Sequence, residues 1–365
     1  MKNRYEKELL NASIKLDAIS DTSGTITSLT KKILKEEDCE ALCSLYSELN
    51  RILDYKKSGK ETIAFAKYVD DCLLRYFGYK KIKEITQITK VNYETKTLPE
   101  LFDELDKLVG LEIVKEQVKD LVAFQMVNQR RVEKGLRATQ RTLHLAFIGN
   151  PGTGKTTVAR IIGRMYKELG LLSKGHFIEV SRTDLIAGYQ GQTALKVKKV
   201  IENAKGGVLF IDEAYSITEN DNSDSYGREC LTELTKALED YREDLVVIVA
   251  GYTEPMSKFF ESNPGLKSRF NTFISFCDYS EEQLLEIIEN MCQDSDYILD
   301  ESAKQKILNY LKKAIESHDN NFANGRLARN IFEKMTMNHA RRIADKKDAT
   351  REELSTILSS DFSEE

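Results

Sequence analysis

The sequence has no apolar run that approaches the ~20 consecutive residues of a membrane-spanning helix. Its first residues, Met1–Asn11, are rich in Lys, Arg and Glu and contain no apolar secretory segment. The net charge of −5 creates no strong positive field of the kind that attracts nucleic acid. These absences argue against a membrane span and against a nucleic-acid partner, and they predict a cytoplasmic protein.

Cysteine and histidine are few and scattered along the 365 residues. Of the six cysteines only Cys39 and Cys43 are close together, with i,i+4 spacing. No second pair has zinc-finger spacing, and the four histidines join no cluster. We therefore expect reduced thiols and no zinc site.

Helical patterns dominate both ends of the chain. In residues 1–96, leucines and other apolar residues recur at helical spacing, which predicts an N-terminal helical domain. The polar stretch Thr86–Thr97 is typical of a linker. From Ser280, a capping residue, helical patterns return and predict a small helical domain over residues 280–365. Its expected helices are Glu281–Met291, Ser302–Glu316, Gly325–Lys346 and Thr350–Ser359.

The middle of the chain, residues 97–279, alternates short apolar segments with helical patterns. Such segments are typical of parallel strands that are covered by helices on both faces. The predicted fold is therefore α/β, with a doubly wound parallel sheet. The expected strands are Leu143–Ile148, Phe177–Val180, Gly207–Ile211, Leu245–Ala250 and Thr272–Phe276.

A phosphate-binding loop follows the first of these strands and precedes a helix predicted over Thr157–Leu169. It fits the pattern G-x-x-x-x-G-K-[ST], in which glycines let backbone N–H groups surround phosphate oxygens. We expect Lys155 to reach the β- and γ-phosphates and Thr156 to place its hydroxyl on Mg²⁺. The loop is Gly149, Asn150, Pro151, Gly152, Thr153, Gly154, Lys155, Thr156 and Thr157.

Two acidic residues directly follow the third predicted strand. The apolar run Val208–Ile211 delivers Asp212 and Glu213 to the carboxyl edge of the sheet, where α/β folds bind their ligands. We expect Asp212 to hold Mg²⁺ and Glu213 to activate the attacking water. Together with the phosphate loop, these residues predict an ATPase with ATP and Mg²⁺ as its cofactors.

With these two motifs the sequence resembles the AAA+ ATPases. Its flanking segments look like the branch of CbbX-type rubisco activases and SpoVK-like sporulation ATPases, and the resemblance covers about Leu98–Asp361. It implies an α/β core over residues 97–279 with a C-terminal helical lid, and it leaves the N-terminal domain outside. The segments that carry it are Gly188–Ala194, Gly206–Tyr215, Asp244–Tyr252 and Asn263–Phe270.

The resemblance also implies roles for three residues beyond the two motifs. Arg269 matches the arginine finger, which reaches the ATP of a neighbouring subunit. Arg326 matches the sensor-2 position of the lid, with Arg329 as the alternative. Thr253 falls at the sensor-1 position if the preceding strand aligns without gaps, although the family carries asparagine there; Tyr252 is the alternative.

Two further segments match the family's functional loops. The stretch Val109-Gly110-Leu111 corresponds to the segment that lies near the adenine base. Tyr189, between glycines after the second strand, corresponds to the pore loop, and a large side chain on such a loop can grip a polypeptide. The alternative is a tyrosine packed on a surface turn. The polar insert Thr218–Gly227 is either a sensing segment or a solvated loop.

The function that follows is an ATP-hydrolysing ring motor that remodels or threads a protein substrate. It is expected to be a homo-oligomer, a hexamer, with an unidentified protein substrate or adaptor as partner. The alternative is an ATP-gated scaffold or switch in which residues 1–96 dock onto a partner. Lys196, Lys198 and Lys199 follow the pore loop and keep a nucleic-acid motor as a third hypothesis.

Overall fold

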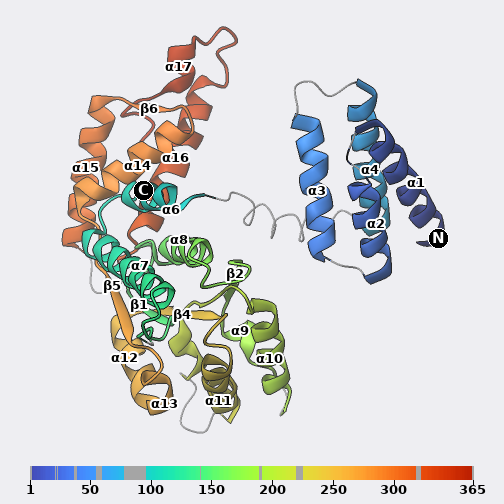
Figure 1. Ribbon diagram of the computed structural model, residues 1–365. Helices are drawn as coiled ribbons and strands as arrows, with labels where there is room; N and C mark the ends of the chain where they lie inside the picture. The colour runs from blue at the N-terminus through green and yellow to red at the C-terminus, as the bar shows by residue number, and fades with distance from the viewer. Residues whose placement is uncertain are drawn as a thin grey trace. The chain divides into compact units, whose positions relative to one another are not determined.

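Figure 1 shows the computed structural model of the chain, which divides into two compact units, Met1–Thr95 and Lys96–Glu365. The predicted linker Thr86–Thr97 lies largely outside the described residues. The structure describes residues 2–20, 22, 24–36, 39–54, 60–77, 96–139, 141–188, 191–218, 225–317 and 322–363. Within these ranges no helix combines the length and apolar character needed to cross a bilayer.

The first unit is helical, as predicted. Its helices bury leucine and isoleucine side chains at i,i+3 and i,i+4 positions to form a core of their own. The carboxylate of Asp17 accepts hydrogen bonds from the backbone N–H groups of Ile26 (3.1 Å) and Thr27 (2.7 Å), which satisfies donors at the start of the next helix. The helices are α1 (Lys2–Ser20), α2 (Thr25–Glu36), α3 (Cys39–Asp54) and α4 (Lys60–Phe77).

The second unit begins with α6 (Leu98–Asp106) and α7 (Glu112–Glu133) and continues as a five-stranded parallel sheet. The strand order is β2-β3-β4-β1-β5, so β1, which the phosphate loop follows, is an interior strand. The strands are β1 (Leu145–Gly149), β2 (Phe177–Val180), β3 (Val208–Ile211), β4 (Val246–Gly251) and β5 (Thr272–Phe276). The elements between them are α8 (Lys155–Glu168), α9 (Arg182–Leu185), α10 (Gln192–Ala204), η1 (Ala214–Ile217), α11 (Ser225–Asp240), α12 (Thr253–Ser262) and α13 (Pro264–Lys267).

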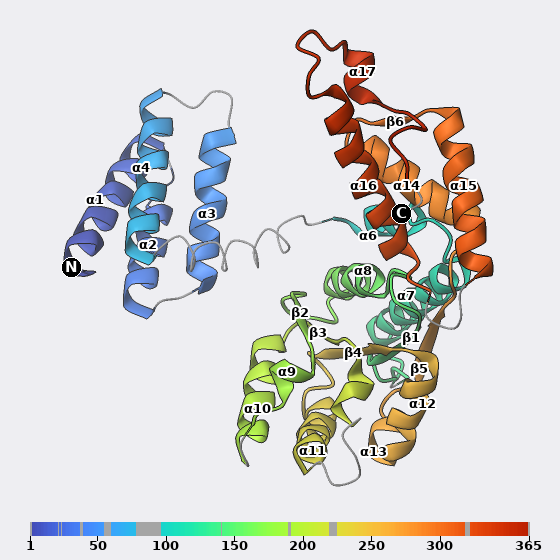
Figure 2. The ribbon, with the colours of Figure 1, turned by 180° about the vertical axis from the view of Figure 1, so that it is seen from behind.

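Both faces of the sheet are covered, which explains the continuous apolar character of the central strands. Successive residues of a strand point to opposite faces. Phe210 therefore joins the core with α7, α8 and the C-terminal helices, whereas Leu209 joins the core with α9–α13. Figures 1 and 2 show α9–α13 on one side of the sheet and α7 and α8 on the other. The predicted doubly wound sheet is confirmed.

The C-terminal lid consists of α14 (Glu281–Asp294), α15 (Glu301–Glu316), α16 (Gly325–Ile343) and α17 (Arg351–Ser355), with short strands β6 (Ile298–Leu299) and β7 (Thr356–Ile357). The capping box predicted at Ser280 is present, since its hydroxyl accepts the N–H of Gln283 at 3.3 Å. The helix predicted over Thr350–Ser359 is wrong in its second half. Thr356 and Ile357 are β-branched and pair in parallel with Ile298 and Leu299, so the helix ends at Ser355.

Candidate nucleotide-binding site

The phosphate loop connects β1 to α8, as predicted. Gly152 (φ +73°) and Gly154 (φ +91°) adopt the left-handed conformation that favours glycine. The turn ends at Lys155, the first residue of α8. Unpaired backbone N–H groups and the helix dipole make this end of α8 suitable for an anion.

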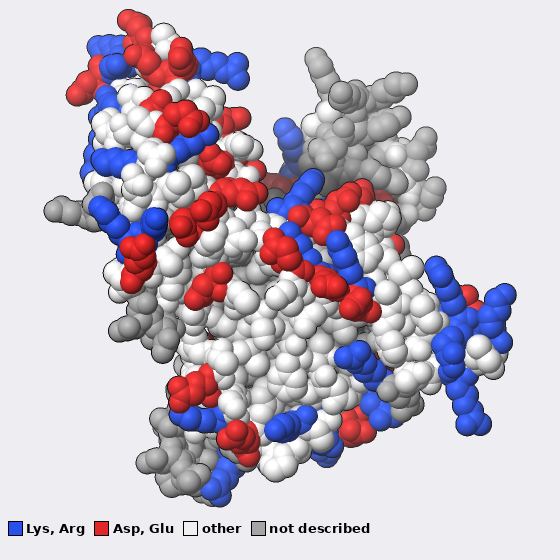
Figure 3. Space-filling model, turned by 90° about the vertical axis from the view of Figure 1, so that its left-hand side faces the viewer, with Lys and Arg blue, Asp and Glu red and all other residues white. Residues whose placement is uncertain are grey.

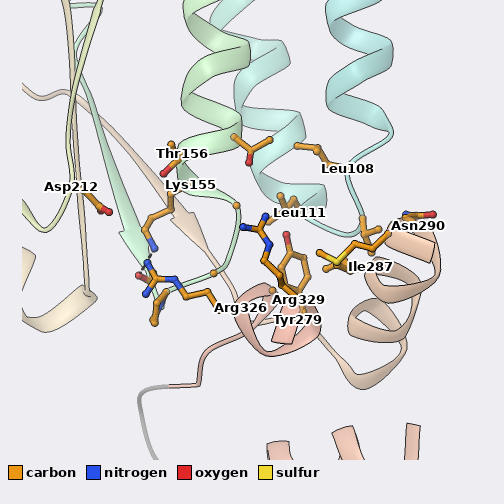
Figure 4. Close-up of a pocket in the computed structure, with 18 of the residues that line it drawn as sticks. Leu108, Leu111, Lys155, Thr156, Asp212, Tyr279, Ile287, Asn290, Arg326 and Arg329 are labelled. Carbon is orange, nitrogen blue, oxygen red and sulfur yellow. Dashed lines mark hydrogen bonds between the residues drawn. The ribbon is translucent and has the colours of Figure 1, made fainter. Parts of the chain in front are cut away.

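A cavity of about 630 Å³ opens beside this loop, between the α/β core and the lid. Figure 4 shows its two chemically different ends: Lys155, Thr156 and Arg326 gather at one, and Leu108, Ile287 and Asn290 lie at the other. The cationic end suits phosphates; the other end, which we call apolar for Leu108 and Ile287 although it also carries the Asn290 amide, suits an aromatic base. The lining consists of Lys107, Leu108, Val109, Leu111, Gly149, Pro151, Gly152, Gly154, Lys155, Thr156, Thr157, Asp212, Glu213, Gly251, Tyr252, Tyr279, Ile287, Asn290, Met291, Asp294, Gly325, Arg326 and Arg329.

Lys155 is held against its own loop. Its Nζ donates to the carbonyl oxygens of Gly149 (2.9 Å) and Asn150 (2.7 Å). Burial lowers the pKa of Lys155 to about 8; Asp212 opposes this shift by favouring the cation, and Arg326 adds to it by repulsion. A buried cation of this kind gains from the arrival of a polyphosphate, which adds negative charge to that of the nearby carboxylates.

The two acidic residues, Asp212 and Glu213, follow β3 at the carboxyl edge of the sheet, and both line the cavity. Glu213 has φ +47° and ψ +46°, a left-handed conformation that costs a non-glycine residue roughly 1 kcal/mol. Its backbone N–H bonds the Oδ1 of Asp212 at 3.1 Å, and its side chain is exposed. Strain of this kind clusters at functional sites because neighbouring structure must maintain it.

The three candidate arginines separate into two groups. Arg326 and Arg329, one turn apart on α16, both line the cavity, and Figure 4 shows Arg326 beside Lys155. Arg269 is not part of the lining. Its Nη1 donates to the carbonyl oxygen of Gly265 at 2.9 Å, and its Nε lies 3.6 Å from a carboxylate oxygen of Glu239.

At the end of β4, the structure brings Tyr252 to the cavity and leaves Thr253 outside it. Thr253 is the exposed first residue of α12, whereas Tyr252 precedes that helix and its ring lies 5.7 Å from the ring of Tyr215. Tyr189, the predicted pore residue, lies outside the described residues, as does most of the insert Thr218–Gly227.

The remaining predicted residues lie in or next to the lining. Val109 and Leu111 line the cavity, while Gly110 between them is packed against Gln283 of α14. Asn150 and Thr153 belong to the phosphate loop, but they face neighbouring protein groups. Asn150 bonds the carboxylate of Asp278, and the Thr153 hydroxyl donates to the carbonyl oxygen of Asn150 at 2.8 Å.

Several lid and hinge residues of the lining were missed by the sequence analysis, among them Tyr279, Ile287, Asn290 and Asp294. Tyr279 follows β5, and the carboxyl end of a parallel strand was a signal that could have found it. The three lid residues belong to an amphipathic helix whose pattern does not say which neighbour its faces meet.

Comparison with known proteins identifies the family of the second unit. Residues 145–278 match the family model described as ATPase family associated with various cellular activities, and residues 280–365 match the AAA lid domain. Stage V sporulation protein K of Bacillus subtilis (strain 168) is 42% identical over 267 residues, which cover 73% of this chain and 83% of that protein. The chain belongs to the AAA ATPases.

Other AAA relatives confirm the branch. Protein CbbX of Cereibacter sphaeroides is 41% identical over 255 residues, covering 70% of this chain and 82% of that protein. The chloroplastic ribulose bisphosphate carboxylase/oxygenase activase of Cyanidioschyzon merolae is 40% identical over 276 residues, covering 75% and 94%. The crystal structure of the FIGL-1 AAA domain in complex with ADP has a TM-score of 0.50 at 19% identity, covers 70% of this chain and 80% of that one, and supports the fold alone.

As a member of this family, the protein binds and hydrolyses ATP. The volume of the cavity lies within the roughly 300–1,000 Å³ that is usual for ligand pockets. Its cationic end is built by the phosphate loop and α16, and its apolar end by the segment before α7 together with α14.

Proposed function

We propose that the protein is an ATP-driven ring motor that remodels a protein substrate. The observation that carries the proposal is the position of Arg269. This arginine lies on the same α/β core as the phosphate loop and yet outside the cavity that the loop forms. If it is the arginine finger, only a second copy of the chain can bring it to the ATP.

Within one subunit we assign hydrolysis to residues of the cavity. Lys155 binds the phosphates, Glu213 orients and activates the water, and Arg326 adds a second cation from the lid. Thr156 and Asp212 would hold Mg²⁺. In the described ranges no three His, Cys, Asp or Glu side chains group to hold a metal by themselves, which fits an ion that keeps water and substrate phosphates as ligands.

Subunits that each donate an arginine to the next must associate head to tail, which closes into a ring or continues as a helix. We propose a closed ring, a hexamer. Hydrolysis would change the angle between the core (97–279) and the lid (280–365), and the Gly-flanked loop with Tyr189 would pull on a polypeptide. On the face shown in Figure 3, basic and acidic side chains are intermixed over most of the surface, and Lys and Arg gather in one group at the right-hand edge.

The experiment is an ATPase assay over a series of protein concentrations. Activity per subunit should rise steeply as the ring assembles. Arg269→Ala should lower kcat by at least about 100-fold at concentrations where the ring is intact. Arg242→Ala is the matched control, because Arg242 also bonds Glu239, at 3.0 Å, but is an exposed surface residue; it should keep native activity.

A second variant tests the chemistry. Glu213→Gln should still bind ATP but lose hydrolysis, and this trapped form can capture the protein substrate. Activity that is independent of concentration and unaffected by Arg269→Ala would refute the ring with shared sites.

The alternative, an ATP-gated switch, is favoured by one observation: residues 1–95 form a separate unit with its own hydrophobic core. We assign this N-terminal domain to recognition or oligomerisation. Tyr189→Ala distinguishes the two functions. A motor should lose remodelling while it retains ATPase activity, whereas a switch should act normally with ATP binding alone.

A further inference from the structure

Two carbonyl oxygens of the phosphate loop, those of Gly152 and Thr153, accept hydrogen bonds from outside the loop. The backbone N–H of Gly325 donates to the carbonyl oxygen of Gly152 at 3.0 Å, and the hydroxyl of Tyr279 donates to that of Thr153 at 3.3 Å. Tyr279 lies in the segment between β5 and α14, the hinge between the core and the lid, and Gly325 is the first residue of α16 in the lid. The lid therefore holds the face of the loop that is opposite to its N–H groups.

Because the peptide unit is planar and trans, these two hydrogen bonds also determine how the loop can bind phosphate. In such a unit the carbonyl oxygen of one residue and the N–H of the next point in opposite directions. Fixing the carbonyl oxygens of Gly152 and Thr153 therefore fixes the direction of the N–H groups of Thr153 and Gly154. These N–H groups belong to the segment that binds phosphate in loops of this pattern.

Asn324 fixes the start of α16 on which this geometry depends. It is completely buried, and its side-chain oxygen accepts the N–H of Tyr279 at 2.9 Å. Its amide nitrogen donates to Asp278 (2.7 Å) and to the carbonyl oxygen of Phe322 (2.9 Å), and it has a longer contact of 3.3 Å to that of Pro151. One side chain thus joins hinge, lid and phosphate loop.

The backbone of Asn324 is strained, which shows that this arrangement is held by its neighbours. Its φ of +46° and ψ of −124° lie in a region that non-glycine residues rarely adopt. Asp278 extends the network, because its two carboxylate oxygens accept the Asn150 amide at 3.1 and 2.9 Å. Asp278 consequently bridges the phosphate loop and the lid.

We propose that Asn324 and Tyr279 are positioning residues for ATP: by placing the lid on the carbonyl side of the phosphate loop, they aim the loop's N–H groups at the phosphates. Docking of the lid on the phosphate loop and formation of the phosphate site then occur together. The coupling is reciprocal, so phosphate in the loop favours the seated lid to the same degree. The inference rests on ATP binding, which the family establishes, and not on the ring or on threading.

The test compares Asn324→Gly with Tyr279→Phe and with a control in the same lid. Glycine tolerates the backbone angles of residue 324, so this variant removes the amide without adding strain. Phenylalanine removes only the hydroxyl from a buried ring. Thr350→Ala is the control. The Thr350 hydroxyl caps α17 by accepting the N–H of Glu353 at 3.2 Å, so its removal destabilises the lid at a point away from the cavity.

Two quantities are measured on dilute protein, so that no ring is required. The first is the affinity for ADP, which Asn324→Gly should weaken at least tenfold and Tyr279→Phe a few-fold, since a hydrogen bond contributes about 1 kcal/mol. The second is hydrogen exchange of residues 325–343 with and without ADP. ADP should slow this exchange in the native protein and in Thr350→Ala, but not in Asn324→Gly.

The proposal is overturned if Asn324→Gly binds ADP as tightly as Thr350→Ala does. It is equally overturned if ADP protects the start of α16 to the native extent in that variant. Because neither measurement needs Arg269, Tyr189 or a protein substrate, failure of the ring motor would leave the result unchanged.

Discussion

The backbone N–H of Gly325 bonds the carbonyl oxygen of Gly152 at 3.0 Å, so the lid helix α16 begins directly on the phosphate loop. Both partners are glycines for a steric reason. A Cβ atom on Gly325 would lie 2.8 Å from that same oxygen, and one on Gly152 would overlap the carbonyl oxygen of Ala323. Because the contact is between backbones, the lid cannot leave the core without changing the surroundings of the loop.

Gly152→Ala should therefore lower ATP affinity far more than the strain of its backbone accounts for. Gly135 supplies a matched control, since both glycines have φ +73° but nothing lies within 4 Å of a Cβ atom at Gly135. Gly135→Ala should cost roughly 1 kcal/mol of stability and leave ATP binding native. Gly152→Ala should introduce the same backbone strain and also displace the lid, which should weaken ATP binding at least tenfold. Equal nucleotide affinities in the two variants would contradict the backbone contact.

The motifs predicted the fold and the phosphate end of the site because their chemistry is local. The segment from Gly149 to Thr157 carries its own turn, helix start and cation, so spacing alone identifies it. The apolar end is different. Ile287 and Asn290 reach the cavity only because the lid packs on the core, a long-range contact that no local pattern encodes. The position of Tyr252 likewise depends on where β4 ends, and strand ends are the least certain part of a pattern.

The pH dependence of kcat/KM for ATP should follow the ionisation of Lys155. The pKa of this lysine is lowered to about 8 by burial, so the free protein loses the cation as the pH rises through 8. Bound phosphates favour the cation and raise its pKa. Accordingly kcat/KM for ATP should fall tenfold per pH unit above about 8, while kcat stays level to a higher pH. Steady-state rates measured from about pH 6 to about pH 10 give the pH profiles of kcat/KM and of kcat. A flat kcat/KM profile would show that Lys155 remains charged throughout.

Tyr252 and Thr253 are adjacent in sequence, but only Tyr252 lines the cavity. Substituting each in turn should show which of them contributes to hydrolysis. Tyr252 lines the cavity, so Tyr252→Ala should lower kcat by at least about tenfold, the cost of roughly 1.4 kcal/mol of lost interaction in the transition state. Thr253 is exposed on α12, so Thr253→Ala should leave kcat and KM within about twofold of native. Thermal unfolding of both variants controls for stability. A larger kinetic loss in Thr253→Ala would return the sensor-1 role to that residue.

The partly buried ion pair between Arg342 and Asp361 should make the stability of the lid depend on pH. Asp361 is almost completely buried, and its oxygens accept Arg342 Nε at 2.8 Å and Nη2 at 2.9 Å. Burial acts to raise the pKa of Asp361, but the bonds from Arg342 and from the backbone N–H of Leu358 outweigh it, and the pKa lies below its ordinary value of 3.8. The stabilisation is therefore complete above the ordinary value and is lost as the pH falls below it.

Arg342→Ala should accordingly lower the free energy of unfolding by about 3 kcal/mol at pH 7, because it leaves a buried carboxylate without its partner. The neighbouring Arg341→Ala is the control: its side chain is exposed, and the change should stay within about 0.5 kcal/mol. Chemical denaturation at about pH 7 and again at about pH 3, above and below the ordinary pKa, checks the sign. The gap between the two variants should narrow at the lower pH, since a protonated Asp361 needs no cation. A gap that widened on acidification would mean that the pair does not hold Asp361 ionised.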